Sequence, residues 1–285
     1  EQLIATGFLS IGPKVLAEVD QAKMQMDIVD EQLDTFGRVF LGMTFGCARC
    51  HDHKFDPIDS ADYYGMAGIF KSTRTMETYT KVAKWNENLL ESPEAAAQKQ
   101  EYDARLAAKK EQIAQRVAEA DRAVKEAHTG ESPLPEQLEE LYSEETKTQL
   151  KRLRDELAAL EKAPPDLPAA MGVGEDTVVD VAIHLRGNPL KLGDVAPRRA
   201  PAVFTGDDAL SFTSSESGRL TLAKWLADPS KAFAARVYVN RLWRWHFGEG
   251  IVRTTDNFGL LGEAPSHPEL LDWLAKRFAD DGWST

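Results

Sequence analysis

The stretch MDIVDEQLDTFGRVFLGMTFGCARCHDHKFDPI, residues 26–58, decides how the N-terminal part of the chain folds. In its first half the apolar residues recur at steps of three and four: Ile28, Val29, Leu33, Phe36, Val39, Phe40 and Met43. This spacing predicts an amphipathic helix that ends near residues 42–46 and leads into Cys47. Pro57 then breaks the chain, and Ser60 is the predicted cap of a short helix through residues 61–70.

The composition is that of a globular protein with enough chain for a sizeable core. The chain has 285 residues, of which 42% are hydrophobic and 28% charged. No apolar run approaches the roughly 20 residues that a membrane span needs. The net charge of −12, without clustered Lys and Arg, argues against nucleic acid as a partner. The chain starts at Glu1 and ends in DDGWST, so we expect both ends to lie within a longer protein.

Residues 93–163 differ from the rest, because Ala, Glu, Lys, Gln, Arg and Leu dominate them. Two narrow apolar stripes run through this segment: Leu106, Ile113, Val117, Ala120 and Val124, then Leu138, Leu141, Leu150, Leu153, Leu157 and Leu160. The breaker HTGESPLP, residues 128–135, separates them. We predict an inserted antiparallel coiled-coil hairpin, which is either a solvated spacer or a contact surface for a protein partner.

Residues 164–216 form a linking segment with a small β part. Val179, Val181, Ile183 and Leu185 alternate with other residues, which predicts a strand, and we expect APAVF, residues 200–204, to pair with it. From residue 217 onward helices return, and Ser266 with Glu269 forms a predicted capping box. The expected fold class is therefore mainly α: helical domains with a small β segment and an inserted antiparallel coiled-coil hairpin.

The two cysteines of the chain stand in the sequence Cys47-Ala48-Arg49-Cys50-His51, which is a C-x-x-C-H motif. This is the pattern of covalent c-type haem attachment. Two thiols three residues apart can each add to a vinyl group of one porphyrin, and the next residue, His51, is then the proximal iron ligand. With only two cysteines and six histidines in the chain, this motif would rarely arise by chance.

Other interpretations of the motif stay open. Cys47, Cys50, His51 and His53 are four ligands of the kinds that zinc takes, and the two thiols alone could form a disulfide or a redox dithiol. Candidates for the sixth iron ligand are Met66, Met76 and His246, with His267 as a further imidazole.

The residues around the motif have two interpretations each. Arg49 and Lys54 could pair with haem propionates, and His53 could bond a propionate or fix a loop. Asp52, Asp56 and Asp59 either cap turns or take part in the site. The sequence shows no Ser-His-Asp order and no phosphate loop, so whether the protein is an enzyme is left open.

Two long stretches resemble known families. FLGMTFGCARCHDHKFDPIDSADYYGMAGIF, residues 40–70, resembles the planctomycete cytochrome-c-like domain PSCyt2 (DUF1549). Residues 217–278, which run from SGRLTLAKWL to LDWLAKRF, resemble the start of its usual partner, the PSD1 domain (DUF1553), and residues 184–204 resemble the region that links the two. The expected organisation is the end of a PSCyt2-like domain (1–92), the hairpin (93–163), the linking segment (164–216) and the start of a PSD1-like domain (217–285).

The resemblance implies an exported protein, in the periplasm or at the cell surface, that binds haem c through Cys47, Cys50 and His51. It also implies electron transfer in an oxidative process, with a redox partner protein. The alternative is a non-redox binding or scaffold protein in which the motif is a structural zinc or disulfide site.

Overall fold

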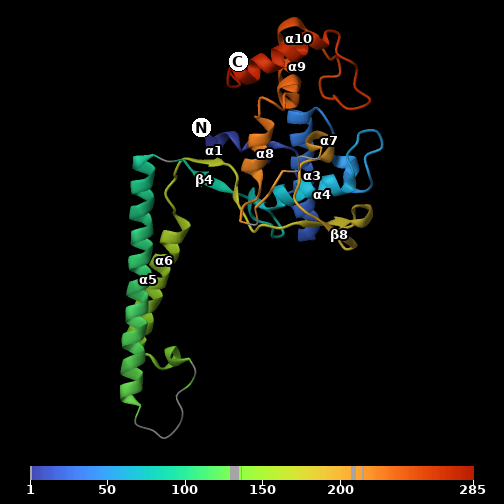
Figure 1. The fold of residues 1–285 in the computed structure, drawn as a ribbon. Coiled ribbons are helices and arrows are strands. Elements are labelled where there is room, and N and C mark those ends of the chain that lie inside the picture. Colours follow the sequence, from blue (N-terminus) through green and yellow to red (C-terminus); the bar gives the residue numbers. More distant parts are fainter. Residues whose placement is uncertain (1, 91, 129–134, 136, 207–209, 214) are drawn as a thin grey trace. The chain divides into compact units, whose positions relative to one another are not determined.

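The computed structural model describes residues 2–90, 92–128, 135, 137–206, 210–213 and 215–285. It is mainly helical with small antiparallel two-stranded sheets, which confirms the predicted fold class. The chain divides into two compact units (Figure 1): Glu1–Asn88 with Ala170–Thr285, called the core unit here, and Leu89–Ala169, called the hairpin unit. None of the helices in the described ranges is long and apolar enough to cross a membrane.

The core unit is built from short helices and strand pairs. Its helices are α1 (Gln2–Ala5), α2 (Phe8–Ile11), α3 (Gln21–Phe36), the π-helix η1 (Gly37–Leu41), the 3₁₀-helix η2 (Gly46–Arg49), α4 (Ser60–Lys71), the 3₁₀-turn η4 (Leu185–Gly187), α7 (Ala202–Thr205), α8 (Arg219–Leu226), α9 (Phe233–Phe247) and α10 (Pro268–Asp280). Its strand pairs are β1 (Thr73–Arg74) with β6 (Gly174–Glu175), β2 (Met76–Thr78) with β3 (Lys84–Trp85), and β7 (Val181–His184) with β8 (Leu192–Ala196).

Helix α3 packs against α4 and buries the apolar stripe that its sequence predicts, with Val29, Leu33 and Phe36 in the main core. The helical chain continues through η1 and ends at Gly42, whose left-handed φ of +56° suits a glycine. The predicted cap of α4 is wrong by one residue. The carboxylate of Asp59, not the hydroxyl of Ser60, accepts the backbone N–H of Asp62, because Asp59 has the extended backbone that a cap requires.

The linking segment forms the hairpin β7–β8, and here the sequence prediction is partly wrong. The strand exists, but its partner is Leu192–Ala196, while residues 202–204 of the expected partner belong to the short helix α7. The pairing register shifts between Ala182 and His184, and this irregularity breaks the alternation. His184 is therefore buried and Leu185 is exposed, the reverse of the predicted pattern.

The C-terminal helices α9 and α10 pack together around a second core that includes Leu271 and Ala275. Asn240 on α9 is fully buried, and its side-chain amide bonds both the N–H and the C=O of Val252. The predicted capping box at Ser266 is wrong. The N-cap residue is His267, which makes no side-chain cap bond, because the Ser266 hydroxyl donates instead to the carbonyl of Ile251.

The hairpin unit contains α5 (Pro93–Ala127), η3 (Leu138–Leu141) and α6 (Glu144–Lys162). The strands β4 (Glu87–Leu89) and β5 (Ala169–Met171) pair with each other. Helices α5 and α6 pack along each other, as predicted, and bury Ala120, Tyr142 and Leu150. Leu141, predicted to lie in the stripe, is half exposed on η3. Residues 129–134 of the predicted breaker lie outside the described residues.

Candidate functional site

The C-x-x-C-H motif occupies the short helix η2 and the residue that ends it. Phe45 and Ala48, three residues apart, are fully buried in the main core. Cys47 and Cys50, also three residues apart, point away from that core and are exposed, and both thiols are free. Residues three apart lie on the same face of a 3₁₀-helix, so one face carries Phe45 and Ala48 into the core and another carries both sulfurs to the surface.

His51 follows on the surface with its imidazole exposed. Its Nδ1 lies 2.7 Å from the backbone carbonyl oxygen of Asp52. Because a carbonyl oxygen can only accept, Nδ1 is the donor in this bond, and in the neutral ring Nε2 then carries the lone pair. Metal-ligating histidines commonly hold the same arrangement, in which the N–H of one ring nitrogen bonds a backbone carbonyl and orients the other.

His53, unlike His51, has a buried side chain, and its Nδ1 accepts a hydrogen bond instead of donating one. Its side chain is only 6% exposed, and its Nδ1 accepts the backbone N–H of Asp56 at 2.8 Å. The Oδ2 of Asp56 lies 3.6 Å from the same nitrogen, but this is no ion pair because Nδ1 is already an acceptor. His53 therefore closes the loop that follows the motif, which is one of the two roles expected for it.

The three aspartates of this loop cap turns and join segments. The carboxylate of Asp52 accepts the N–H of Ser60 at 2.9 Å, and Asp59 caps α4. The carboxylate of Asp56 is buried and accepts the N–H of Leu260 at 2.9 Å. In the described residues, no group of three or more His, Cys, Asp or Glu side chains could hold a metal ion.

One segment near the C-terminus holds both ends of the motif loop, residues 42–56. The N–H of Phe258 donates to the carbonyl of Gly42 at 2.7 Å, just before the motif. Two residues later, the N–H of Leu260 bonds Asp56, just after it. Between them Gly259 lies against the Asp56 carboxylate, where a Cβ would overlap it. The 258–260 segment therefore clamps the loop that carries both cysteines.

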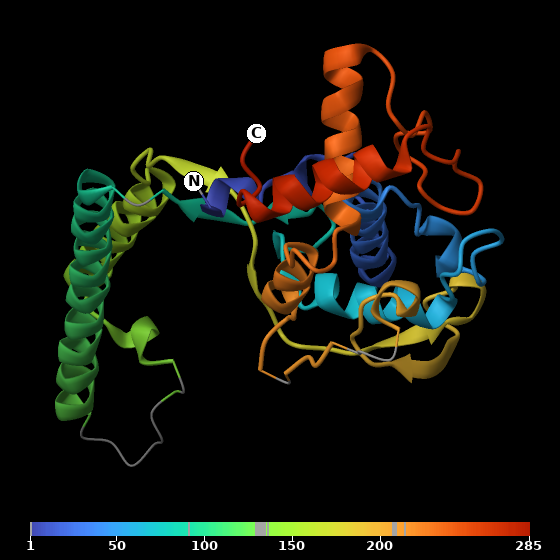
Figure 2. The ribbon, with the colours of Figure 1, turned by 45° about the horizontal axis from the view of Figure 1, so that its top comes forward.

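The turn of the β7–β8 hairpin lies against the other side of the motif (Figure 2). A Cβ at Gly187 would stand 2.5 Å from the Sγ of Cys50, so this residue must be small. The Tyr64 hydroxyl lies 2.9 Å from the carbonyl oxygen of Arg49 and 3.5 Å from that of His184, so it links the motif to the hairpin. Burial raises the pKa of Tyr64 to about 12, which keeps this donor protonated.

Arg49 is held on the protein and is not free to pair with a propionate. Its guanidinium bonds Asp27 at 2.8 Å and Asp30 at 3.2 Å, both on α3, and the Tyr63 hydroxyl bonds Asp30 as well. Partial burial disfavours its charge, yet the bond to Asp27 and the nearby acids raise its pKa. Lys54 remains exposed, with its ammonium 5.1 Å from the ring centre of Phe55.

Sequence reasoning missed His184. Its side chain is buried behind the motif, with its ring centre 5.1 Å from that of Tyr64, and its Nδ1 has no hydrogen-bond partner among the described residues. Burial lowers its pKa, and the nearby charges of Lys71 and Arg49 lower it further. The only sequence signal was a histidine inside an apolar strand pattern, and the register shift that turns it inward cannot be seen in the sequence.

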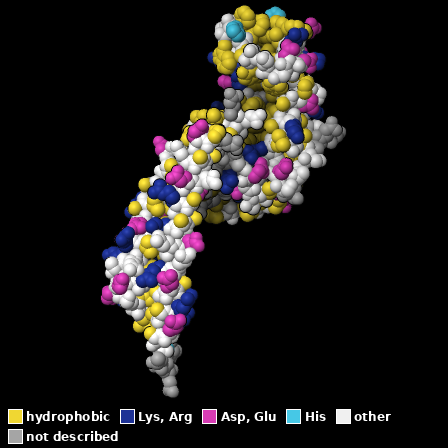
Figure 3. All heavy atoms as spheres, turned by 90° about the vertical axis from the view of Figure 1, so that its left-hand side faces the viewer, with side chains coloured by type: hydrophobic (Ala, Val, Ile, Leu, Met, Phe, Trp, Pro, Cys, Tyr) yellow, Lys and Arg dark blue, Asp and Glu magenta, His cyan; other side chains and the backbone are white. Residues whose placement is uncertain are grey.

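The candidates for a sixth ligand lie in different surroundings. Met66 is fully buried in the main core, and Met76 belongs to a separate cluster with Met24 and Ile28. A packed thioether could reach an iron at the surface only if the core opened. His246 is exposed on α9, where hydrophobic side chains and histidines gather over the C-terminal helices (Figure 3). No hydrogen bond or ring contact in the described residues links these side chains to the motif.

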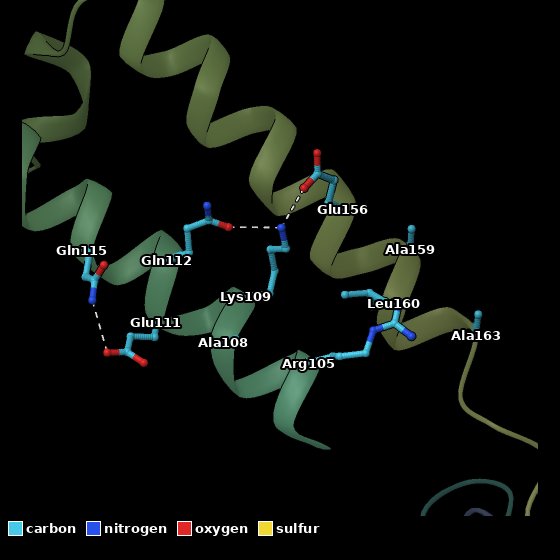
Figure 4. Close-up of a pocket in the computed structure, with 10 residues that line it drawn as sticks. All are labelled: Arg105, Ala108, Lys109, Glu111, Gln112, Gln115, Glu156, Ala159, Leu160 and Ala163. Atoms are coloured by element: carbon cyan, nitrogen blue, oxygen red, sulfur yellow. Dashed lines mark hydrogen bonds and ion pairs between the residues drawn. The ribbon is translucent and has the colours of Figure 1, made fainter. Parts of the chain in front are cut away.

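One cavity lies in the hairpin unit, far in sequence from the motif. It has a volume of about 910 Å³ and is an open groove between α5 and α6. Lys109 crosses it to bond Glu156 at 2.8 Å and Gln112 at 3.1 Å (Figure 4). Its polar groups thus bond each other, as on the solvated face of a helical pair.

The fold and the motif define a mainly helical protein that presents two free thiols and one oriented imidazole on its surface. Residues 1–75 match PSCyt2, a protein family of unknown function (DUF1549), and residues 218–285 match PSD1, a second family of unknown function (DUF1553). The chain thus carries segments of both families, as the resemblance indicated, and the first name suggests a cytochrome-like family. No curated protein and no solved structure matches the chain.

Proposed function

We propose that this chain is part of an exported protein that binds haem c and transfers electrons. Cys47 and Cys50 are the attachment thiols and His51 is the proximal ligand. The observation that carries the proposal is the arrangement of these three side chains. Both thiols are free and exposed, and the bond from His51 to the Asp52 carbonyl leaves Nε2 as the nitrogen able to bind iron.

The chain's own residues have defined tasks in this proposal. Cys47 and Cys50 would hold the haem through carbon–sulfur bonds, since each thiol would add across one vinyl group and nothing would be released. The carbonyl of Asp52 orients His51, while the bonds from Arg49 to Asp27 and Asp30 hold the helix that carries the cysteines. When bound, the haem supplies one-electron chemistry at an iron that changes between two oxidation states.

Only the family resemblance supports three parts of the proposal: export to the periplasm or cell surface, a redox partner, and an oxidative process. The sixth ligand stays a prediction among Met66, Met76 and His246. No observation favours the zinc or disulfide alternative, in which the motif would only brace a scaffold or binding protein. That alternative becomes an outcome of the test below.

The test is to produce the chain with an export signal in cells that carry haem-maturation machinery, beside a known c-type cytochrome as a loading control. We expect the denatured protein to keep the mass of one haem and a Soret band. The variant Cys47→Ala/Cys50→Ala should lose both. His51→Gln should lose the native absorbance, whereas its matched control, His53→Gln, should keep it because His53 only closes the loop.

A wild-type chain that stays colourless while the loading control matures would refute the proposal. Native mass spectrometry of the same sample then separates the alternatives. One bound zinc without haem would support the scaffold protein with a metal site, and a mass lower by two hydrogens would support a disulfide.

A further inference from the structure

The turn of the β7–β8 hairpin touches the motif although it is more than 130 residues away in sequence. Gly187 packs directly on the Sγ of Cys50, and Tyr64 links the backbone of Arg49 to that of His184. Anything attached through the sulfur of Cys50 must therefore lie beside this turn.

The chemistry of the turn is unusual for this acidic protein. The ten residues HLRGNPLKLG, residues 184–193, include three leucines, two cations and no acid. The leucines are exposed, Leu185 at 50%, Leu190 at 82% and Leu192 at 60%. Arg186 and Lys191 are also exposed and, in the part of the chain that the structure describes, have no ion-pair partner. Exposed apolar side chains gathered in one place commonly mark a binding surface.

The backbone of the turn is also strained. Arg186 has a φ of +55° and ψ of +34°, and Gly187 follows with a φ of +72°. A non-glycine residue in the left-handed region costs about 1–2 kcal/mol, and such strain is concentrated at functional sites.

We propose that residues 185–192 form a second wall of the haem site. Leu185, Leu190 and Leu192 cover part of the porphyrin, while Arg186 and Lys191 face the propionates. The occupant follows from the chemistry of the turn, since an apolar macrocycle with two carboxylates matches leucines beside unpaired cations. This inference rests on the proposed haem attachment and names further residues of that same site.

Hydrogen exchange tests the proposal without an activity assay. We compare haem-loaded wild type with the Cys47→Ala/Cys50→Ala variant produced in the same cells. The amides of residues 185–192 should exchange about tenfold more slowly in the loaded protein, because the porphyrin covers the turn. The stretch 219–226 on α8, which lies elsewhere, should exchange alike in both.

Two variants sharpen the test. Leu185→Glu/Leu190→Glu should remove the added protection and lower the midpoint potential, because the haem becomes more exposed to water. Leu220→Glu is the matched control, since Leu220 is 60% exposed on α8, and it should change neither.

The outcomes separate this inference from the proposed function. If haem is attached but the exchange of residues 185–192 is unchanged, the second wall is refuted and the haem protein stands. If the wild-type chain never acquires haem, both fall together.

Discussion

Replacing Gly187 with alanine tests the contact between the β7–β8 hairpin and Cys50. The substitution has two separable costs. The φ of +72° is left-handed, which costs an alanine about 1–2 kcal/mol. The added Cβ would also stand 2.5 Å from the Sγ of Cys50, while its next neighbours, at 3.7 and 3.9 Å, are in ordinary contact.

The sulfur, not the backbone, has to yield. Cys50 is exposed and its Sγ turns about a single bond, so the clash is relieved by a change of rotamer at about 0.5–1.5 kcal/mol. We therefore expect Gly187→Ala to destabilise the core unit by about 1.5–3.5 kcal/mol in total. Gly248→Ala is the matched control. Its φ of +87° is also left-handed, but its Cβ would meet nothing within 4 Å, so only the backbone cost of about 1–2 kcal/mol remains.

The measurement is urea unfolding of the reduced protein followed by tryptophan fluorescence. All six tryptophans (residues 85, 225, 243, 245, 273 and 283) lie in the core unit, so this signal does not report the hairpin unit. A double-mutant cycle with Cys50→Ala isolates the clash, since alanine has no sulfur to displace. We expect a coupling energy of about 0.5–1.5 kcal/mol between residues 187 and 50, and none between 248 and 50. Equal costs for Gly187→Ala in both backgrounds would refute the contact.

Substitutions at Asp56, Asn240, Leu150 and His184 test other parts of the structure. Asp56→Ala should destabilise the core unit by about 1.5–3 kcal/mol because the N–H of Leu260 loses its charged, buried acceptor, and Asp56→Asn, which keeps an oxygen, should cost less in the same urea assay. Asn240→Ala should cost about 2–3 kcal/mol there, since both backbone groups of Val252 lose their partner. Leu150→Ala should lower the stability of the hairpin unit by about 2–5 kcal/mol in circular dichroism while leaving the tryptophan transition unchanged. Burial, and then the charges of Lys71 and Arg49, lower the pKa of His184, so the unfolded chain binds a proton before the folded chain does as the pH falls below about 6.5. The core unit should therefore lose up to about 1.4 kcal/mol of stability per pH unit from this group. His184→Asn should flatten that slope, whereas His267→Gln, at an exposed position, should not.

The spacing of apolar residues predicted the helices correctly, because a helix face is set by residues close together in the sequence. The apolar steps in residues 28–36 give α3, and the stripes of residues 113–124 and 150 give the packed faces of α5 and α6, because a helix repeats over a few residues. The spacing of three between Cys47 and Cys50 likewise placed both thiols on one side of a helical turn. The residues expected to act together are thus exposed together, although their chemistry remains a prediction.

The wrong predictions concern helix caps and strand faces, which depend on backbone conformation or on distant partners as well as on the local sequence. Asp59 and Ser60 are both good caps, and only the backbone conformation decides that the aspartate serves. Ser266 could have capped α10, but a bond to the distant carbonyl of Ile251 holds it. In β7 a shift of one residue in the pairing reverses which side chains are buried, and the shift depends on the partner strand.

The contacts that hold the motif loop join residues about 200 positions apart, so no local sequence pattern predicts them. Gly42 and Asp56 stand at the two ends of the loop, and both receive N–H bonds from the 258–260 segment. In a PSCyt2 segment without its PSD1 neighbour, the Gly42 carbonyl and the Asp56 carboxylate would need other partners, and Asp56 is a buried acid. Without the 258–260 segment, both acceptors would bond water instead, and the loop would lose the two protein bonds that hold its ends. The geometry that presents Cys47 and Cys50 is therefore a joint property of both segments, and a change in the 258–260 segment should alter the reactivity of the thiols without touching either cysteine.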